Sequence, residues 1–109
     1  MSGDNASEAP YKVVFLRKKA KQTWDEWKRS NRSEAKAVVE NLTTSPFTRT
    51  PGITYRLREP LDWFSYKGVR YQRWQTKPGL RSDCRVWCGQ VDGNVAIERF
   101  HTQHPNQTK

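Results

Sequence analysis

The sequence has no long apolar run, and it is poor in aliphatic residues. Only 34% of its 109 residues are hydrophobic, and five Trp, four Tyr and four Phe supply much of that fraction. No segment approaches the roughly 20 apolar residues that a membrane helix needs. The opening MSGDNASEAP lacks the basic and apolar regions of a secretory signal. We expect residues 1–10 to be a disordered leader and the protein to be cytoplasmic, without a membrane partner.

Acidic residues are also scarce. The chain carries 11 Asp and Glu against 20 Lys and Arg, which gives a formal net charge of +9. A small globular protein with this balance is suited to a polyanionic partner, although the charge can also serve solubility alone. Glycine-rich phosphate loops and serine-triad motifs are absent, and Asp25-Glu26 falls on the outer face of a predicted helix. These absences argue against nucleotide hydrolysis, serine hydrolysis and two-carboxylate catalysis.

Cysteine and histidine occur only twice each. Cys84 and Cys88 lie in one predicted strand, about 13 Å apart at a rise of ~3.3 Å per residue. That separation is too large for a disulfide, and too large for the two sulfurs to share a zinc ion even with His101 and His104 as further ligands. We therefore expect reduced thiols, no metal site and no cofactor.

Local patterns predict an α+β domain over residues 11–109. We expect a strand at 11–16, helices at 17–30 and 30–46 that form an antiparallel hairpin, a short extended piece at 54–58, and strands at 69–76, 84–91 and 94–102. Asp92-Gly93 is a strong signal for a tight hairpin turn. The last three strands should form an antiparallel meander that the first strand joins. The helices should cover one face of this sheet and leave the other face free.

Alternation predicts which strand residues share a face. Cys84, Val86 and Cys88 should lie under the helices, which places Arg85 and Trp87 on the open face. In the flanking strands Tyr71 and Arg73 alternate with Gln72 and Trp74, and Val95, Ile97 and Arg99 alternate with Ala96, Glu98 and Phe100. A slip of one residue in the pairing would reverse either of these strands, so the alternation does not decide which of their residues face the helices.

An open face with arginines beside tryptophans is suited to single-stranded RNA. Arginine binds phosphate through two parallel hydrogen bonds, and an indole can stack on a base. The alternative is that the tryptophans belong to the core and the arginines form a solvated rim. The predicted RNA-binding residues are Arg70, Trp74, Lys77, Arg81, Trp87, Arg99 and Lys109.

Three stretches in this order resemble the RelE/ParE toxin superfamily of bacterial toxin–antitoxin systems. They are YKVVFLRKKAKQTWDEW, RYQRWQ and CRVWCGQVDGNVAIERFHTQHPNQTK. The ending HTQHPNQTK is similar to a C-terminal variant of actinobacterial-type members. The resemblance implies the fold expected above and an antitoxin partner. It also implies one of two activities, since RelE-like members cut mRNA in the ribosomal A site, whereas ParE-like members poison DNA gyrase.

The resemblance extends to some site residues and departs at others. Arg85 matches the central-strand arginine of RelE-like toxins. Archetypal members have two alternating lysines in the preceding strand, where this chain has Gln72 and Trp74 with Arg70 and Arg73 nearby. The C-terminal arginine and tyrosine are absent, and the region holds His101, Gln103, His104 and Lys109 instead. Other ribonucleases of the superfamily use a histidine near the C-terminus. The candidate catalytic residues are therefore Arg85, Arg73, His101 and His104.

RNA cleavage by its own 2′-hydroxyl needs a base, an acid and cations near the phosphate. Histidine titrates near neutrality and can be the base or the acid, while arginines supply the positive charge. This chemistry needs no metal ion, and together with the resemblance to RelE-like toxins it implies a ribosome-dependent mRNA endonuclease that inhibits translation. Its partners would be an antitoxin, mRNA and the ribosome. The alternatives are a non-catalytic toxin that binds DNA gyrase, and a non-toxic member that binds RNA or a protein partner, with His101 and His104 at a strand end and in a polar tail.

Overall fold

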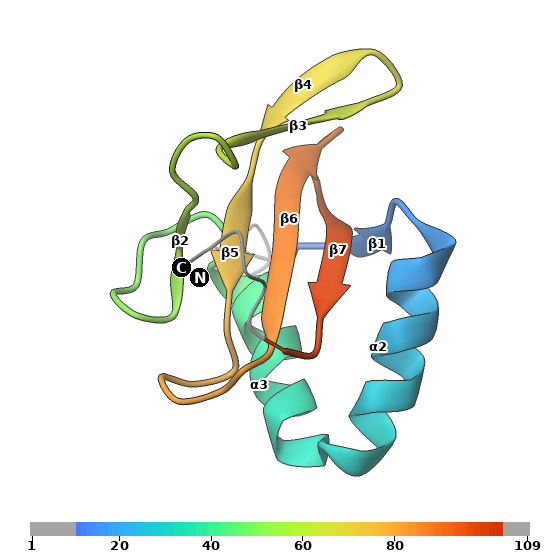
Figure 1. The fold of residues 1–109 in the computed structure, drawn as a ribbon, viewed down its shortest axis with the longest axis vertical. Coiled ribbons are helices and arrows are strands. Elements are labelled where there is room, and N and C mark those ends of the chain that lie inside the picture. The colour runs from blue at the N-terminus through green and yellow to red at the C-terminus, as the bar shows by residue number, and fades with distance from the viewer. Residues whose placement is uncertain (1–10, 104–109) are drawn as a thin grey trace, which may run out of the picture.

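A computed structural model describes residues 11–103, and these form two helices and seven strands in the order predicted for the α+β fold. The elements are β1 (Val13–Phe15), α2 (Lys18–Ser30), α3 (Arg32–Thr44), β2 (Thr54–Arg56), β3 (Trp63–Tyr66), β4 (Val69–Gln72), β5 (Trp74–Thr76), β6 (Arg85–Val91) and β7 (Asn94–His101) (Figure 1). The expected leader, His104 and Lys109 lie outside the described residues.

Five strands form the main sheet in the order β1-β7-β6-β5-β2. β5, β6 and β7 are the predicted meander, and β1 joins it parallel to β7, so the expected sheet is confirmed. Asp92 and Gly93 turn between β6 and β7 with φ of 53° and 80°. β2 adds a fifth strand at the far edge, next to β5.

The two helices cover one face of this sheet. Ala20, Val38 and Leu42 pack with Cys84, Val86 and Cys88, which confirms the predicted face of the central strand. Farther along the same layer, Phe100 lies against Trp24 and Trp27, with ring centroids 5.5 and 5.2 Å away. In the described part of the chain, neither helix has the length and hydrophobicity needed to cross a bilayer.

The opposite face is half covered, which corrects the expectation that it is free. β3 and β4 pair into a two-stranded arm whose turn, Lys67-Gly68, has φ of 52° and 81°. The arm extends beside one end of β6 and β7 (Figure 1). Phe64 of the arm packs on Val91 and Ala96 and forms a small second core.

The single strand predicted over 69–76 is in fact two strands. Arg73 separates β4 from β5, and its backbone N–H donates to the Asp62 carbonyl at 2.9 Å while its own carbonyl accepts from Leu57 N–H at 3.1 Å. The chain therefore leaves the arm at Arg73 and enters the main sheet. A glycine commonly interrupts a strand, but here Gly68 forms the turn of a hairpin together with Lys67.

A β-bulge in β7 reverses the predicted alternation. Trp87 pairs with Arg99 and Cys88 pairs with Ile97, so Glu98 is an extra residue in β7. A bulge of this kind places two successive side chains on one face. The expected grouping of Arg99 with Val95 and Ile97 on one face is therefore wrong: Arg99 lies opposite Trp87, and Phe100 joins the helical core.

Candidate functional site

The half of the sheet that the arm leaves uncovered carries a group of polar side chains, which we call the charged cluster. Its members are Arg73, Lys77, Arg85, Trp87, Glu98, Arg99 and His101. They come from β6, β7 and the residues that flank β5. The bulge brings Glu98, Arg99 and His101 to this face together. Six of the seven were predicted as site residues from the sequence, and Glu98 was not.

Arg85 lies at the start of β6 and is only 7% exposed. Its Nη1 donates to the backbone carbonyls of Ser82 and Cys84, so the loop before β6 holds the guanidinium in place. Across the strand pair, Arg85 is in register with His101. Burial lowers the pKa of Lys77, and the positive charge of Arg85 lowers it further. The lysine ammonium therefore lies close enough to the Arg85 guanidinium to be repelled by it.

Glu98 is the acidic centre of the cluster. Its carboxylate accepts hydrogen bonds from Nε and Nη2 of Arg73, both at 2.8 Å, and the Glu98 side chain is 3% exposed. Arg99 Nε and Arg17 Nη2 lie farther away, at 3.6 and 3.8 Å from the same carboxylate. A buried charge needs such partners, and the bidentate geometry holds the Arg73 guanidinium rigidly.

Trp87 forms the floor of the cluster and is 3% exposed. Its ring centroid lies 4.8 Å from the Arg73 guanidinium carbon and 4.5 Å from the centre of the His101 ring. The indole Nε1–H donates to Gln75 Oε1 at 2.9 Å. Trp87 therefore positions the side chains above it, and an exposed stacking surface for RNA bases is not what the structure shows at this residue.

His101 combines a half-buried position with a low proton affinity. Burial lowers its pKa below 6.5, Arg99 and Arg73 lower it further, and Glu98 opposes them in part. Its Nε2 is buried and has no hydrogen-bond partner within residues 11–103. At neutral pH the imidazole is therefore uncharged and has the protonation state of a general base.

The remaining predicted RNA-binding residues lie apart from the cluster. Trp74 faces the helical side, where its ring is 5.9 Å from that of Phe47. Arg70 lies on the arm, with its guanidinium carbon 4.8 Å from the centre of the Trp63 ring. Arg81 is exposed in the loop before β6. The predicted RNA-binding residues are thus divided between the charged cluster and three other places, while His104 and Lys109 lie outside the described residues.

The two cysteines face away from this site. Cys84 and Cys88 are free and buried in the helical core, and burial raises the pKa of each thiol to about 12. Residues 11–103 bring no three metal-binding side chains together. Because His101 lies on the opposite face of the sheet, these cysteines and His101 do not form a joint ligand set.

Sequence reasoning missed three residues that connect or neutralise the cluster. Glu98 is one, and its signal was the single acidic residue of β7, directly after the apolar run Val95-Ala96-Ile97. The other two are Gln75 and Tyr55, which link the cluster to the sheet edge, since Gln75 Nε2 donates to the Tyr55 hydroxyl at 2.7 Å. Nothing in their local sequence indicates that Tyr55 and Gln75 pair across strands.

The fold has a counterpart among solved structures. No family model and no curated protein matches the sequence. The chain is similar to a structure described as the YoeB-YefM complex from Staphylococcus aureus, with a TM-score of 0.56 and 11% sequence identity over 83% of this chain and 93% of the other. At this identity the likeness shows the fold, which is RelE/YoeB-like, as the sequence resemblance implied.

Proposed function

We propose that this protein is the toxin of a toxin–antitoxin system and that it cleaves mRNA on the ribosome without a metal ion. The observation that supports this most is the pairing of Arg85 with His101 across β6 and β7. The two residues lie opposite each other on neighbouring strands of a strongly basic protein, Arg85 is held by backbone carbonyls, and the pKa of His101 is lowered. These are the groups that cleavage by the 2′-hydroxyl requires.

The proposed mechanism divides the chemistry between these groups. His101 takes the proton from the 2′-hydroxyl, and the 2′-oxygen then attacks the adjacent phosphorus. The bond to the 5′-oxygen breaks, which leaves a 2′,3′-cyclic phosphate on one fragment and a 5′-hydroxyl on the other. Arg85 stabilises the negative charge on the phosphorane, and its carbonyl contacts hold it there before the charge develops. His104 is the proposed donor of the proton to the leaving oxygen.

The proposed partners follow from the same hypothesis of a toxin. The similar structure is described as a complex of two proteins, YoeB and YefM, which supports an antitoxin as the partner of this chain. We place the protein in the cytoplasm, where the ribosome and mRNA are found. Its HTQHPNQTK ending supports membership of the actinobacterial-type branch of the superfamily.

Primer extension on a defined mRNA, with and without ribosomes, tests the proposal. We expect the native protein to cut within A-site codons only when ribosomes are present. Arg85→Ala should reduce the rate by about 10²- to 10³-fold, the usual cost of losing one preorganised electrostatic group. Arg29→Ala, which removes the same charge from the exposed end of α2, is the matched control and should cut normally.

Other outcomes separate the alternatives. An intact message together with loss of gyrase supercoiling activity would support the gyrase-binding alternative and contradict cleavage. Equal cutting by Arg85→Ala and Arg29→Ala would remove Arg85 from the mechanism. Absence of growth arrest on expression, with RNA bound but uncut, would indicate a non-toxic RNA-binding member of the fold.

A further inference from the structure

A basic hollow of about 680 Å³ lies along the edge strand β2, outside the charged cluster. Its wall includes Arg49, Arg56 and Arg58, and all three are exposed. Within the described residues, none of these guanidiniums forms an ion pair with a carboxylate. The hollow therefore offers three exposed cations that form no ion pair with a carboxylate of residues 11–103.

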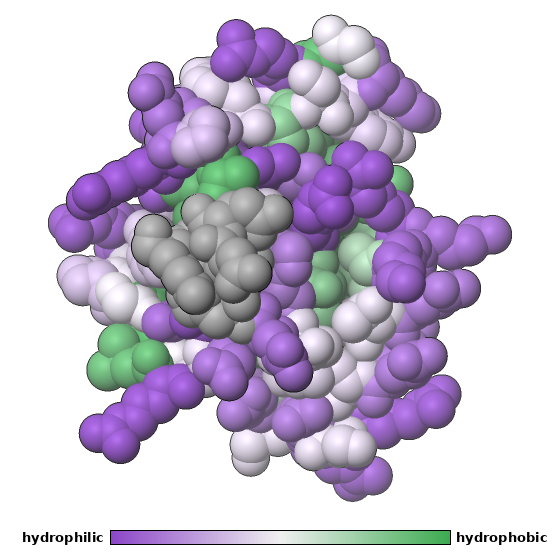
Figure 2. Space-filling view, in the orientation of Figure 1, coloured by the Kyte–Doolittle hydropathy of each residue, from purple (hydrophilic) through white to green (hydrophobic). Residues whose placement is uncertain are grey.

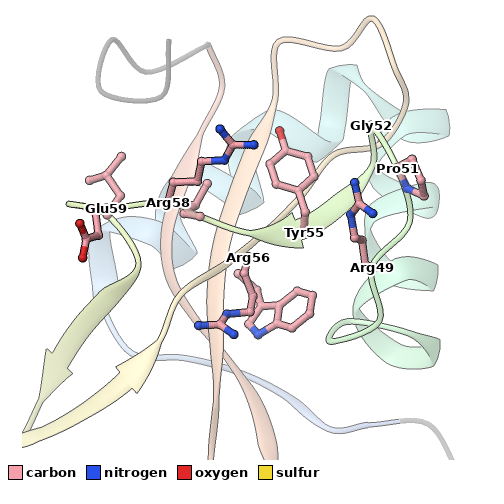
Figure 3. A pocket seen from close by; sticks show the side chains of 10 residues that line it. Arg49, Pro51, Gly52, Tyr55, Arg56, Arg58 and Glu59 are labelled. Atoms are coloured by element: carbon pink, nitrogen blue, oxygen red, sulfur yellow. The ribbon is translucent and has the colours of Figure 1, made fainter.

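The lining also contains aromatic surface and only one acidic residue. Tyr55 and Trp74 contribute rings, and Glu59 contributes the carboxylate. Figure 3 shows Tyr55 and Arg58 extending to one side of β2 and Arg56 to the other, with Arg49 and Glu59 at opposite ends. Guanidiniums that flank an aromatic ring bind a nucleotide, because its phosphates pair with the cations while its base stacks on the ring.

The hollow is connected to the charged cluster by hydrogen bonds. Tyr55 pairs with Gln75 across β2 and β5, and Gln75 pairs with Trp87 across β5 and β6. The Tyr55 hydroxyl accepts from Gln75 Nε2 at 2.7 Å, and Gln75 Oε1 accepts from Trp87 Nε1 at 2.9 Å. A row of three side chains thus leads over the sheet from the hollow to the cluster. The face on which they lie is largely hydrophilic (Figure 2).

We propose that this hollow is a second RNA subsite, which holds a nucleotide on one side of the cleaved bond. Arg49, Arg56 and Arg58 bind the phosphates, and the Tyr55 ring stacks on the base. The identity of the ligand as a single-stranded RNA rests on the proposed function. An acidic protein chain would use the cations but would leave the aromatic ring without a partner, so RNA fits the lining better.

Binding without cleavage tests the subsite separately from the reaction. The probe is a fluorescein-labelled single-stranded octamer of 2′-O-methyl RNA, which has no free 2′-hydroxyl to attack. Fluorescence anisotropy with the full chain gives the affinity at several salt concentrations. Arg49→Gln, Arg56→Gln and Arg58→Gln are combined in one variant. The matched control combines Lys18→Gln, Lys19→Gln and Arg29→Gln, which remove the same charge from exposed positions of α2.

We expect the hollow variant to lower the slope of log affinity against log salt by about 2, because three phosphate contacts at about 0.7 each are lost. The control should keep the slope of the native protein. Tyr55→Leu should weaken binding on the order of tenfold at every salt concentration through lost stacking. Tyr55→Phe keeps the ring and should bind as the native protein does, which separates stacking from the hydrogen bond to Gln75.

Equal slopes for the hollow variant and its control would overturn the subsite, even if the native protein cleaves mRNA as proposed. Conversely, a smaller slope of log affinity against log salt in the hollow variant than in its control would support the subsite even if no cleavage were found. If a poly-glutamate peptide displaced the octamer and Tyr55→Leu had no effect, the hollow would be a site for acidic chains and the RNA subsite would be wrong. Thermal unfolding of each variant checks that the fold is retained.

Discussion

Strands β6 and β7 carry two contrasting surfaces on the face away from the helices. One half, around Gly89, Val91 and Ala96, is made of small residues and is covered by Phe64 of the arm. The other half is polar and holds the charged cluster. The same two strands thus form a satellite core at one end and a candidate site at the other.

The difference lies in what stabilises each half. A Cβ at Gly89 would lie 2.6 Å from the Phe64 ring, so the absence of a side chain there allows the arm to approach. The apolar half is held by burial, which depends little on charge. The polar half is held by one buried carboxylate, Glu98, and by backbone carbonyls that bind Arg85. Substitutions in the apolar half should therefore act through lost burial, and substitutions in the polar half through unpaired charge.

The largest effect on stability is expected from the apolar half. Phe64→Ala removes the ring that closes the second core, and it should lower the free energy of unfolding by about 3–5 kcal/mol. Urea denaturation measures this change. Trp63→Ala on the outer side of the same arm is the control, because Trp63 is 38% exposed and its loss should cost much less. Equal losses would show that the arm is not anchored through Phe64.

A somewhat smaller effect is expected from the carboxylate of the polar half. Glu98→Gln keeps the shape but leaves Arg73 buried without a counter-charge, which should cost about 3 kcal/mol. Asp25→Asn, which removes an exposed carboxylate that also pairs with two cations, should leave the urea midpoint nearly unchanged. A Glu98→Gln protein as stable as the native one would mean that Arg73 finds another partner.

The smallest expected effect is a pH dependence that belongs to the polar half. The pKa of His101 is below 6.5 in the folded state, so the unfolded chain binds more protons between that pKa and 6.5. Stability should therefore fall as the pH is lowered through 6.5 and should stop falling below the folded pKa. Urea midpoints measured across this range for the native protein and for His101→Gln isolate the contribution, which the variant should lack.

The lowered pKa of His101 also predicts how the cleavage rate depends on pH. If His101 is the base, the acid limb of the rate profile should have its midpoint below 6.5. Arg99→Gln removes a cation that lowers this pKa and should move the limb upward, toward 6.5. Movement in the other direction, or no movement, would contradict the assignment of His101 as the base.

Local sequence patterns were sufficient for the helical layer and the central strand. The spacing of Ala20, Trp24 and Trp27 places one apolar face on α2, and the alternation around Cys84, Val86 and Cys88 predicts the buried face of β6 correctly. These features depend on neighbouring residues, so periodicity alone reveals them. The choice of Arg85 and His101 as site residues came from the resemblance, and the structure places the two in register.

The arm and the bulge depend on pairing between distant residues, and local patterns do not encode them. Lys67-Gly68 is a weak turn signal, and the position of the arm becomes evident only from contacts between distant residues, such as those of Phe64 with Gly89 and Ala96. Glu98 becomes an extra residue in β7 because of its position opposite Trp87 and Cys88. For this reason strict alternation groups Arg99 wrongly with Val95 and Ile97, and it gives no sign of the contacts of Glu98.

The bulge has a consequence for inheritance as well as for geometry. Glu98 has no residue opposite it, because Cys88 pairs with Ile97 and Trp87 pairs with Arg99. Loss of the Glu98 codon would therefore remove the bulge and leave Phe100 and His101 on their present faces. Loss of two codons at this point would shift the alternation by one residue, which would turn Phe100 outward and His101 toward the helical core. The parity of this short segment therefore constrains which insertions and deletions a lineage of such proteins can tolerate.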